Sequence, residues 1–415
     1  MTIGFFGLSH LGLNYLAASA AKGFRVVGYD ENKELIEKLK SNKVIFKEPL
    51  LFENLKRFNK NIIFSNKISD LKKSKIIFIS LDVKTDKYGK SDLNGIKKII
   101  KIIKLKINKK NLILMSQVKP GFTKKISWDK SRLFYQVETL VFGQAFQRAF
   151  NPERIILGVN NPQKNINNEV KNFYNKFNCP IIKTDYNSAE LIKISINIYL
   201  ISSITTTNLL AKIVKKLNGN WEDLEKAIRL DKRIGKFAYL NPGLGISGGN
   251  LERDLYNISQ IAKQNNISHD LFKIWKKNSV IQKSWASSFY NNELKKNKKL
   301  RIGILGLAYK INTNSTKNSP SLDLIKNIKE NKIYAFDPVV KKIKKQKNLI
   351  LTQNTNDIIN ISDVLFVMTP WYEFKNIKTQ SIINSKIKKI IDPFGIFKNE
   401  KELLKRKKIK YYSLI

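Results

Sequence analysis

The chain has 415 residues, of which 42% are hydrophobic, 10% aromatic and 27% charged. This composition is typical of globular proteins and excludes a disordered polyelectrolyte, and the length predicts two or three domains. The single cysteine, Cys179, excludes an intramolecular disulfide and a multi-cysteine zinc site. Because there are also only 2 histidines, we expect no metal centre.

Lysine and arginine exceed aspartate and glutamate by 77 − 33 = 44, an excess found in proteins that bind nucleic acids, anionic membranes or anionic metabolites. The lysines are scattered along the chain among many asparagines and isoleucines, which AT-rich codons specify. A nucleic-acid site needs basic charges clustered on one face, so we expect no nucleic-acid partner. No basic leader precedes the first apolar strand and no apolar run reaches about 18 residues, so we expect a cytoplasmic protein without a membrane segment.

The first thirty residues have the pattern strand, turn, helix, strand. An apolar run over 3–7 stops at a glycine turn, helical spacing follows over 11–22, and a second apolar run covers 24–30. Further apolar runs at 76–80 and 111–116 are separated by segments with helical periodicity. Strands and helices that alternate in this way predict a parallel, doubly wound sheet.

A long helix is predicted in the middle of the chain. From Ser188 onward apolar residues recur at helical spacing without interruption by proline or glycine, and a helix of this length usually links or dimerises domains. After the lysine- and asparagine-rich segment 291–299, a new strand and glycine turn begin a second α/β domain. We therefore predict a homodimer with two Rossmann-like, doubly wound domains, 1–186 and 293–415, joined by a central helical dimerisation domain, 187–292.

The glycine turn after the first strand predicts a dinucleotide site. Gly7 and Gly12 occupy the first and third glycine positions of the fingerprint, where glycine lets the backbone approach a pyrophosphate at the helix N-terminus. Ser9 stands in the middle position, where its side chain is expected to weaken binding. Asp30 ends the second strand about 20 residues on, where a carboxylate accepts ribose hydroxyls and repels a 2′-phosphate. We therefore expect NAD rather than NADP, with His10 as a surface residue.

Further motifs follow in one order along the rest of the chain. They are Glu48-Pro49, MSQVKPG at 115–121, VETLVFGQAFQRAFNPERIILG at 137–158, AELIKISINIYL at 189–200, DKRIG at 231–235, NPGLGISGGNLERD at 241–254, GLAYKINTNSTKNSP at 306–320, FDP at 336–338 and TPWYEF at 369–374. Together they resemble the UDP-glucose/GDP-mannose dehydrogenase family, whose members oxidise the C6 alcohol of a nucleotide sugar to a carboxylate in two NAD-dependent steps. The resemblance implies a UDP- or GDP-sugar substrate, held by the C-terminal α/β domain, and a role in polysaccharide precursor synthesis.

The resemblance also implies roles for single residues. Glu138 would organise a water molecule, and Lys193 would stabilise an oxyanion together with Asn197. Because Asn197 follows Lys193 by four residues, both lie on the same face of the helix. Asp254 would orient the hydrolytic water or a base. The other implied residues are Lys317 toward the cofactor, and Arg233, Tyr239, Gly245 and Lys310 toward the sugar nucleotide.

One departure from the family pattern bears directly on the chemistry. When Asp254 is aligned with the last aspartate of the family motif, Asn250 stands where the catalytic cysteine belongs. A carboxamide nitrogen is delocalised into its carbonyl and cannot attack an aldehyde as a thiolate does, so the usual covalent route to the second oxidation is lost. Other altered positions are Gln117, Phe142, Asp82-Val83, Arg253, Asn314-Ser315 and Lys317.

Two functions remain open from the sequence. The first is an NAD-dependent nucleotide-sugar 6-dehydrogenase of the UDP-glucose type, because hydride removal needs only a base or water, an oxyanion stabiliser and a positioned nicotinamide. Such an enzyme either stops at the aldehyde or uses the hydrated aldehyde for the second oxidation. The second is a non-catalytic homologue that keeps affinity for a nucleotide sugar or NAD and partners an active paralogue. Reduction of NAD by the purified protein with any nucleotide sugar would separate the two.

Overall fold

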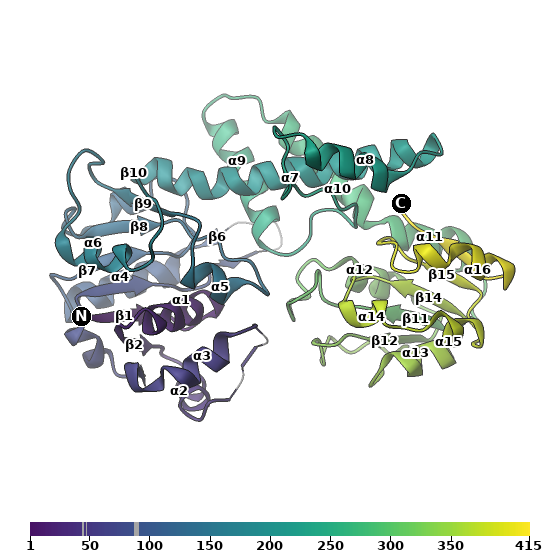
Figure 1. Ribbon diagram of the computed structural model, residues 1–415, viewed down its shortest axis with the longest axis horizontal. Helices are drawn as coiled ribbons and strands as arrows, with labels where there is room; N and C mark the ends of the chain where they lie inside the picture. Colours follow the sequence, from purple (N-terminus) through teal and green to yellow (C-terminus); the bar gives the residue numbers. More distant parts are fainter. Residues whose placement is uncertain (44, 47, 87–90) are drawn as a thin grey trace. The chain divides into compact units, whose positions relative to one another are not determined.

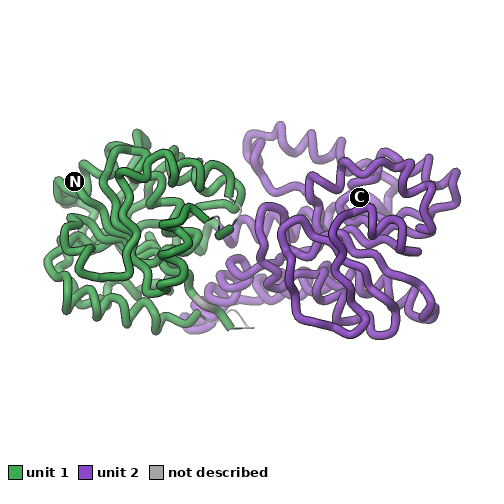
Figure 2. Tube along the Cα trace, turned by 90° about the horizontal axis from the view of Figure 1, so that it is seen from below, with its two compact units in different colours: residues 1–196 green, residues 197–415 purple. Residues whose placement is uncertain are grey.

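A computed structural model describes residues 1–43, 45–46, 48–86 and 91–415 of the chain. It divides into two compact units, residues 1–196 and 197–415 (Figure 2). The boundaries 1–186, 187–292 and 293–415 expected from the sequence stay a prediction, since compactness alone does not separate the middle segment from the second unit.

The first unit is built on an eight-stranded sheet with the order β10-β9-β8-β7-β4-β1-β2-β3 (Figure 1). Its strands are β1 (Thr2–Phe6), β2 (Arg25–Tyr29), β3 (Ile62–Ser65), β4 (Ile76–Ile79), β7 (Asn111–Leu114), β8 (Leu133–Gln136), β9 (Ile155–Val159) and β10 (Ile181–Asp185). β5 (Lys84–Thr85) and β6 (Ser91–Asp92) pair antiparallel in a separate two-stranded sheet. The strands around β1 follow the order of a Rossmann-like sheet. The doubly wound fold expected from the sequence is confirmed.

The sequence pattern predicted a parallel sheet, but one pair of strands in this sheet is antiparallel. β8 and β9 pair antiparallel, with Tyr135 opposite Gly158, whereas β9 and β10 are parallel to each other. Because the two strands run in opposite directions, the connection 137–154 does not cross to the other edge of the sheet, and β9 begins at the edge at which β8 ends. This edge also receives the turns that follow β1, β2, β4 and β7, because those strands are parallel to β8.

Helices cover both faces of this sheet. They are α1 (His10–Ala21), α2 (Lys33–Lys40), α3 (Leu51–Arg57), α4 (Asn94–Lys106), α5 (Ala145–Phe150) and α6 (Asn168–Asn175). Ile3 and Phe5 of β1 belong to the core under α1, α3 and α5, whereas Phe6 belongs to the core under α4. α1 and α5 lie side by side on their face (Figure 1). The alternation of side chains along a buried strand thus explains the two apolar layers.

The long helix α7 (Tyr186–Lys216) begins in the first unit and continues into the second. It confirms the long helix predicted from Ser188 onward. By length and composition it is also the one helix among the described residues that could cross a membrane. Tyr186 and Ala189 are buried in the core of the first sheet and Ile201 in a small cluster with Ile246 and Leu255, so contacts with protein account for part of its apolar character.

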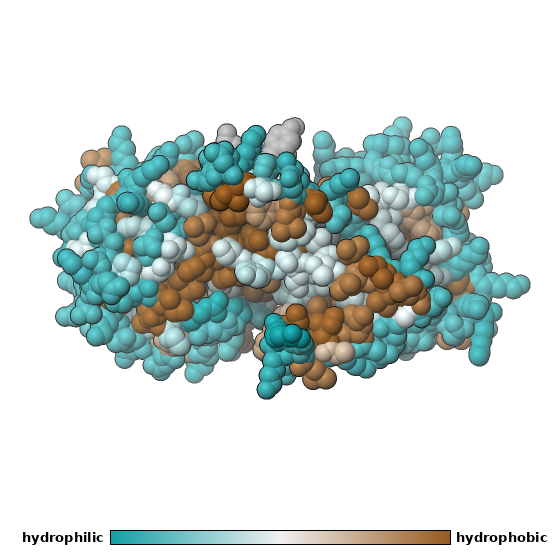
Figure 3. Space-filling model, turned by 90° about the horizontal axis from the view of Figure 1, so that it is seen from above, coloured by the Kyte–Doolittle hydropathy of each residue, from teal (hydrophilic) through white to brown (hydrophobic). Residues whose placement is uncertain are grey.

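Four helices follow α7 before the second sheet: α8 (Trp221–Leu230), α9 (Asn250–Gln264), α10 (Asp270–Lys283) and α11 (Trp285–Glu293). Figure 3 views the face to which α7, α8, α9 and α10 contribute, and apolar atoms gather on it. Exposed large apolar residues between 199 and 281 include Tyr199, Leu209, Leu217, Leu230 and Phe237. Large apolar side chains gathered on one exposed face of a segment are typical of a surface that another molecule covers.

The second unit carries a six-stranded sheet with the order β13-β12-β11-β14-β15-β16, and every described pairing in it is parallel. Its strands are β11 (Ile302–Leu305), β12 (Ile333–Phe336), β13 (Leu349–Leu351), β14 (Val364–Val367), β15 (Lys389–Ile391) and β16 (Lys410–Tyr412). Its helices are α12 (Pro320–Asn327), α13 (Thr355–Ile361), α14 (Tyr372–Lys375), α15 (Thr379–Ile383) and α16 (Lys401–Arg406). The strand order, third-second-first-fourth-fifth-sixth, is that of a doubly wound sheet, so this prediction too is confirmed.

Candidate active site

The turn between β1 and α1 requires glycine at two of its positions. Gly7 has φ +98°, and a Cβ there would lie 2.7 Å from the Leu81 side chain. A Cβ on Gly12 would lie 2.0 Å from the carbonyl oxygen of Gly7. The chain therefore bends from strand into helix with no side chain in the bend at these positions, which is the cradle that a pyrophosphate needs at a helix N-terminus.

Ser9 fits the middle position of this turn without backbone strain. Its φ is −66°, so the position does not need glycine, and its hydroxyl donates to the carbonyl of Ser80, 2.9 Å away at the end of β4. The hydroxyl of Ser80 in turn donates to the carbonyl of Gly7 at 2.8 Å. Weaker dinucleotide binding because of Ser9 stays a prediction.

Asp30 lies beside the same turn and keeps part of its hydrogen-bonding capacity. One carboxylate oxygen accepts from the backbone N–H of Leu8 at 2.9 Å, and the other accepts from Asn32 at 3.0 Å. The side chain is half-buried, and a carboxylate can accept about four hydrogen bonds. Ribose hydroxyls can use the remaining sites, which supports the expected preference for NAD.

His10, the first residue of α1, is not the surface residue that the sequence had led us to expect. Its side chain is 16% exposed, and its Nε2 lies 2.7 Å from Oε2 of Glu48. Its ring also lies 4.3 Å from that of Phe142 and 5.1 Å from that of Phe46, measured between centroids. These partners are far away along the chain, so the residues around His10 gave no sign of its burial.

Lys193 and Glu138 are brought together in the first unit. Nζ of Lys193 lies 3.7 Å from Oε2 of Glu138, and Lys193 is buried in α7. The other oxygen of Glu138 accepts from the backbone N–H of Leu140. A buried ammonium beside a carboxylate at the edge where β8 ends can stabilise negative charge on a bound oxygen.

Glu190, one turn before Lys193, was not singled out from the sequence. Its carboxylate accepts from the backbone N–H of Gly121 at 2.6 Å, from that of Thr123 at 2.8 Å and from the Thr123 hydroxyl at 2.6 Å. Burial raises the pKa of this carboxyl group. Glu190 thus fixes the turn after β7 to α7. A glutamate at a position of the helix where the apolar spacing predicts burial was the signal that could have identified this residue from the sequence.

Asn197 and Asp254 are brought together in the second unit. The amide of Asn197 donates to Oδ2 of Asp254, and Nε of Arg253 lies 3.2 Å from Oδ1 of the same carboxylate. All three side chains are buried, Asp254 completely. The carboxylate is therefore held in one orientation by two donors from different elements, α7 and α9.

Asn250 is the first residue of α9 and is exposed. The turn before it contains Gly248, at which a Cβ would lie 2.6 Å from the Tyr309 ring, and Gly249, at which a Cβ would lie 3.3 Å from Nζ of Lys317. Tyr309 is held under this turn, and burial raises its pKa to about 12.

Nζ of Lys310 lies 5.8 Å from the centroid of the Tyr309 ring. The structure therefore gathers Lys310 and Lys317 with the turn that leads to Asn250. A role of Lys317 toward NAD and a role of Lys310 toward the sugar nucleotide both stay predictions.

Arg233 lies apart from these contacts. Its guanidinium is 88% exposed and pairs with Asp231 at 2.6 Å. Tyr239 is also exposed, with its carbonyl accepting from Ser203 and Thr207 of α7 at 2.9 Å each. Their roles toward the sugar nucleotide stay predictions.

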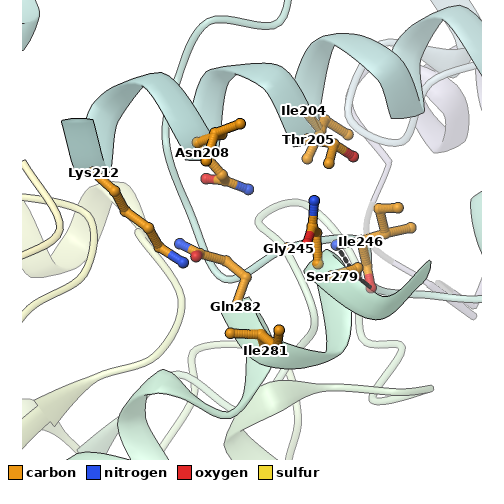
Figure 4. Close-up of a pocket in the computed structure, with 11 residues that line it drawn as sticks. Ile204, Thr205, Asn208, Lys212, Gly245, Ile246, Ser279, Ile281 and Gln282 are labelled. Carbon is orange, nitrogen blue, oxygen red and sulfur yellow. Dashed lines mark hydrogen bonds between the residues drawn. The ribbon is translucent and has the colours of Figure 1, made fainter. Parts of the chain in front are cut away.

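Gly245 lines a small cavity between α7 and α10 (Figure 4). The cavity measures about 60 Å³, which is enough for a few water molecules and far too small for a sugar nucleotide. Asn208 of α7 accepts from the N–H of Gly243, and Gln282 of α10 donates to its carbonyl, both at 2.8 Å. The cavity therefore lies beside a turn in which side chains bind both the N–H and the carbonyl of Gly243. Among the described residues, no group of three His, Cys, Asp or Glu side chains could hold a metal ion.

Three family descriptions match successive parts of this chain. The NAD binding domain of the UDP-glucose/GDP-mannose dehydrogenase family matches residues 1–178, its central domain 187–279 and its UDP binding domain 303–399. A UDP-glucose 6-dehydrogenase of Rickettsia conorii is 30% identical over 446 residues, covering 100% of this chain and 99% of the relative. The chain belongs to the UDP-glucose/GDP-mannose dehydrogenase family.

Solved structures agree with this assignment at the level of the fold. A UDP-glucose dehydrogenase from Pyrobaculum islandicum superposes with a TM-score of 0.83 at 20% identity, covering 94% of this chain and 96% of the other. A UDP-D-ManNAc dehydrogenase from Pyrococcus horikoshii gives 0.82 at 23% identity, covering 95% and 96%. As a member of an NAD-dependent dehydrogenase family, the chain uses NAD, and the cradle at Gly7 and Gly12 fits that cofactor.

Proposed function

We propose that this protein removes hydride from the C6 alcohol of a UDP-sugar, with UDP-glucose as the first candidate, and that it releases the aldehyde or its hydrate. The relative from Rickettsia conorii, which is named as a UDP-glucose 6-dehydrogenase, supports this choice of substrate. The observation that carries the proposal is the buried ammonium of Lys193, 3.7 Å from the Glu138 carboxylate at the edge of the sheet that also receives the dinucleotide turn.

The side chains supply the proton chemistry of this step. As the C6 hydroxyl loses its proton, the Lys193 ammonium and the Asn197 amide favour the negative charge that develops on its oxygen. Asp254 is fixed by Asn197 and Arg253 and takes up the proton directly or through a water molecule. When bound, NAD accepts the hydride that leaves C6. The products of this step are an aldehyde, NADH and one proton.

The step that would follow lacks its nucleophile. Asn250 occupies the position of the family's cysteine, and its amide cannot form the thiohemiacetal through which the aldehyde is oxidised further. We therefore propose one NADH per sugar, with Glu138 ordering the water that hydrates the aldehyde. Membership of a dehydrogenase family favours this enzyme over a non-catalytic homologue.

A panel of UDP- and GDP-sugars with NAD tests the proposal directly. The amount of NADH formed and the sugar product are measured together for each substrate. One NADH per sugar with an aldehyde product is expected. Two NADH per sugar with a carboxylate would overturn the limit to one step, and no NADH with any sugar would overturn the enzyme in favour of the non-catalytic homologue.

We also propose a cytoplasmic homodimer. Tyr199, Leu209 and Ile213 leave apolar surface of α7 exposed, 79% in the case of Tyr199, and a second copy of the chain would bury it. The thiol of Cys179 is free, as is usual in a reducing compartment. Light scattering should give twice the chain mass of 48.0 kDa. Leu209→Glu should give a monomer, whereas the control Leu105→Glu, on exposed α4 surface, should remain a dimer.

A further inference from the structure

The most completely enclosed carboxylate near the dinucleotide turn belongs to Glu48, which the chemistry above does not use. Its side chain has no exposed area. Oε2 accepts from Nε2 of His10 at 2.7 Å and from the backbone N–H of Gly143 at 3.1 Å, and Oε1 accepts from the N–H of Ala145 at 3.0 Å. One side chain therefore joins two stretches of backbone that are more than a hundred residues apart.

The first of these stretches begins with Glu138. Residues 137–144 form neither strand nor helix, so side-chain contacts have to fix their position. Nε of Arg148 donates to the carbonyl of Thr139 at 3.1 Å near its beginning. Glu48 holds its other end through Gly143, which has φ +87° and so suits glycine, and through Ala145.

The second stretch is the dinucleotide turn itself. His10 is the first residue of α1, directly after Ser9 of the cofactor cradle. Its ring is held by Glu48 on one side and packs against the Phe142 ring at a tilt of 33°, with 4.3 Å between the centroids, so it too contacts the segment that follows Glu138. Both ends of this connection are in the first unit, and both adjoin groups proposed to act in the reaction.

We propose that Glu48 is a positioning residue, which holds the segment that carries Glu138 at a fixed distance from the NAD turn through His10, Gly143 and Ala145. Glu48 does not touch the reacting atoms. It acts through Glu138, whose distance from Lys193 depends on where the segment 138–145 lies. This inference rests on the proposed function for its kinetic consequence, but its structural part stands on contacts within one unit.

Glu48→Gln is the sharpest test, because the side chain keeps its size and loses one acceptor. Whichever way the amide turns, its NH₂ group faces a backbone N–H that used to donate to an oxygen. Amide hydrogen exchange of the peptide that contains Gly143 and Ala145 should become faster. The value of kcat for the nucleotide sugar should fall between about tenfold and a hundredfold, since a misplaced catalytic group is costly, while its KM changes less than threefold. Glu53→Gln, on exposed α3 surface, is the matched control and should change neither exchange nor kcat.

A double-substitution cycle separates positioning from general destabilisation. If Glu48 acts through Glu138, then Glu48→Gln should lower kcat less than twofold in a Glu138→Gln background, although thermal unfolding shows both proteins folded. His10→Phe keeps the ring contacts and loses one hydrogen bond, so it should reproduce a smaller part of the effect. Equal losses of kcat in both backgrounds would overturn the positioning role, as would unchanged exchange at Gly143 and Ala145. If the unmodified protein oxidised no nucleotide sugar, the proposed function would fail, and the exchange measurement would still decide whether Glu48 holds the segment.

Discussion

The pattern of strand, glycine turn and acidic strand end occurs twice in the chain, and the two carboxylates have different surroundings. In the first unit Gly7 follows β1 and Asp30 follows β2; in the second, Gly306 follows β11 and Asp337 follows β12. The two glycines have nearly equal φ values of +98° and +95°. The backbone bend is therefore the same, and the difference lies in what surrounds the carboxylate.

Asp337 is saturated by its own chain. Its Oδ2 accepts from the backbone N–H groups of Leu307 and Ala308 at 2.7 and 3.0 Å and from Nε1 of Trp371 at 3.1 Å. Its Oδ1 accepts from Val339 and Val340 at 2.9 and 2.8 Å. The side chain is 1% exposed. No acceptor site remains for a ribose, so Asp337 stabilises the turn, whereas Asp30 has two backbone donors and stays half-buried.

The helix that follows the turn differs as well. α1 begins at His10, directly after the first turn, so its unpaired N–H groups point toward the cradle. In the second unit α12 begins only at Pro320, after a long loop that carries Lys310 and Lys317. In this chain an acidic residue at the end of the second strand therefore indicates a dinucleotide site only under two conditions. The helix must begin directly after the glycine turn, and the carboxylate must have acceptor sites that the protein does not occupy.

The largest effect is expected at Gly12, where the first turn has no room. Gly12→Ala places a Cβ 2.0 Å from the carbonyl of Gly7, so the turn must open and NAD binding should be lost. We expect the first unit to lose about 3 kcal/mol or more of unfolding free energy, measured by thermal and denaturant unfolding. Gly95→Ala in α4, where a Cβ meets nothing within 4 Å, is the control and should be neutral or slightly stabilising.

Asp337→Asn should come next, and it should affect stability rather than NAD. The amide replaces one acceptor oxygen by an NH₂ donor that faces backbone N–H groups. The residues that donate to Asp337 are not exposed, so they cannot turn to water instead. About 2 to 3 kcal/mol of unfolding free energy should be lost, while the dissociation constant for NAD, measured by calorimetry, stays within twofold. Asp323→Asn, at an exposed position of α12, should change neither quantity. A large loss of NAD affinity in Asp337→Asn would refute the division of labour between the two turns.

Asp30→Ala should show the opposite pattern. Removing the carboxylate takes away the acceptor for ribose hydroxyls and the charge that repels a 2′-phosphate, so the preference for NAD over NADP should fall about tenfold. The unfolding free energy should fall by only about 1 kcal/mol, since two half-exposed hydrogen bonds are lost. Calorimetry with both dinucleotides measures the preference, and Glu31→Ala, an exposed neighbour, is the control. Equal binding of NADP by the unmodified protein would contradict the role of Asp30.

Local sequence was sufficient for the parts of the molecule that local physics determines. The apolar runs predicted β1, β2, β4 and β7, and the spacing of Gly7 and Gly12 predicted the turn, because strand burial and tight bends leave few alternatives. The direction of β9 was not predictable in this way, since an apolar strand has the same pattern in either direction. The burial of His10 depends on Glu48 and Phe142, whose approach is set by the folded sheet edge rather than by neighbours in sequence.

The smallest effect is expected at Asn250, which the sequence pattern predicts to stand at the position of the family's catalytic cysteine. Asn250→Cys places a thiol at the first turn of α9, where the helix N-terminus favours a thiolate. The position is exposed, so the new thiol should react with iodoacetamide. The unmodified protein supplies the control rate from Cys179, whose pKa burial raises.

If Asn250 stands at the cysteine position, as the sequence pattern predicts, a thiol there restores the nucleophile, but the other altered positions remain unchanged, among them Gln117 and Phe142. We therefore expect the yield to rise from one NADH per sugar to a value between one and two, with part of the product appearing as the carboxylate, and the added yield to disappear after alkylation. The comparison of NADH and carboxylate before and after alkylation measures this directly. If the variant alkylates rapidly and still gives one NADH per sugar, then the missing sulfur is not what limits the reaction, and the other altered positions must block the second oxidation.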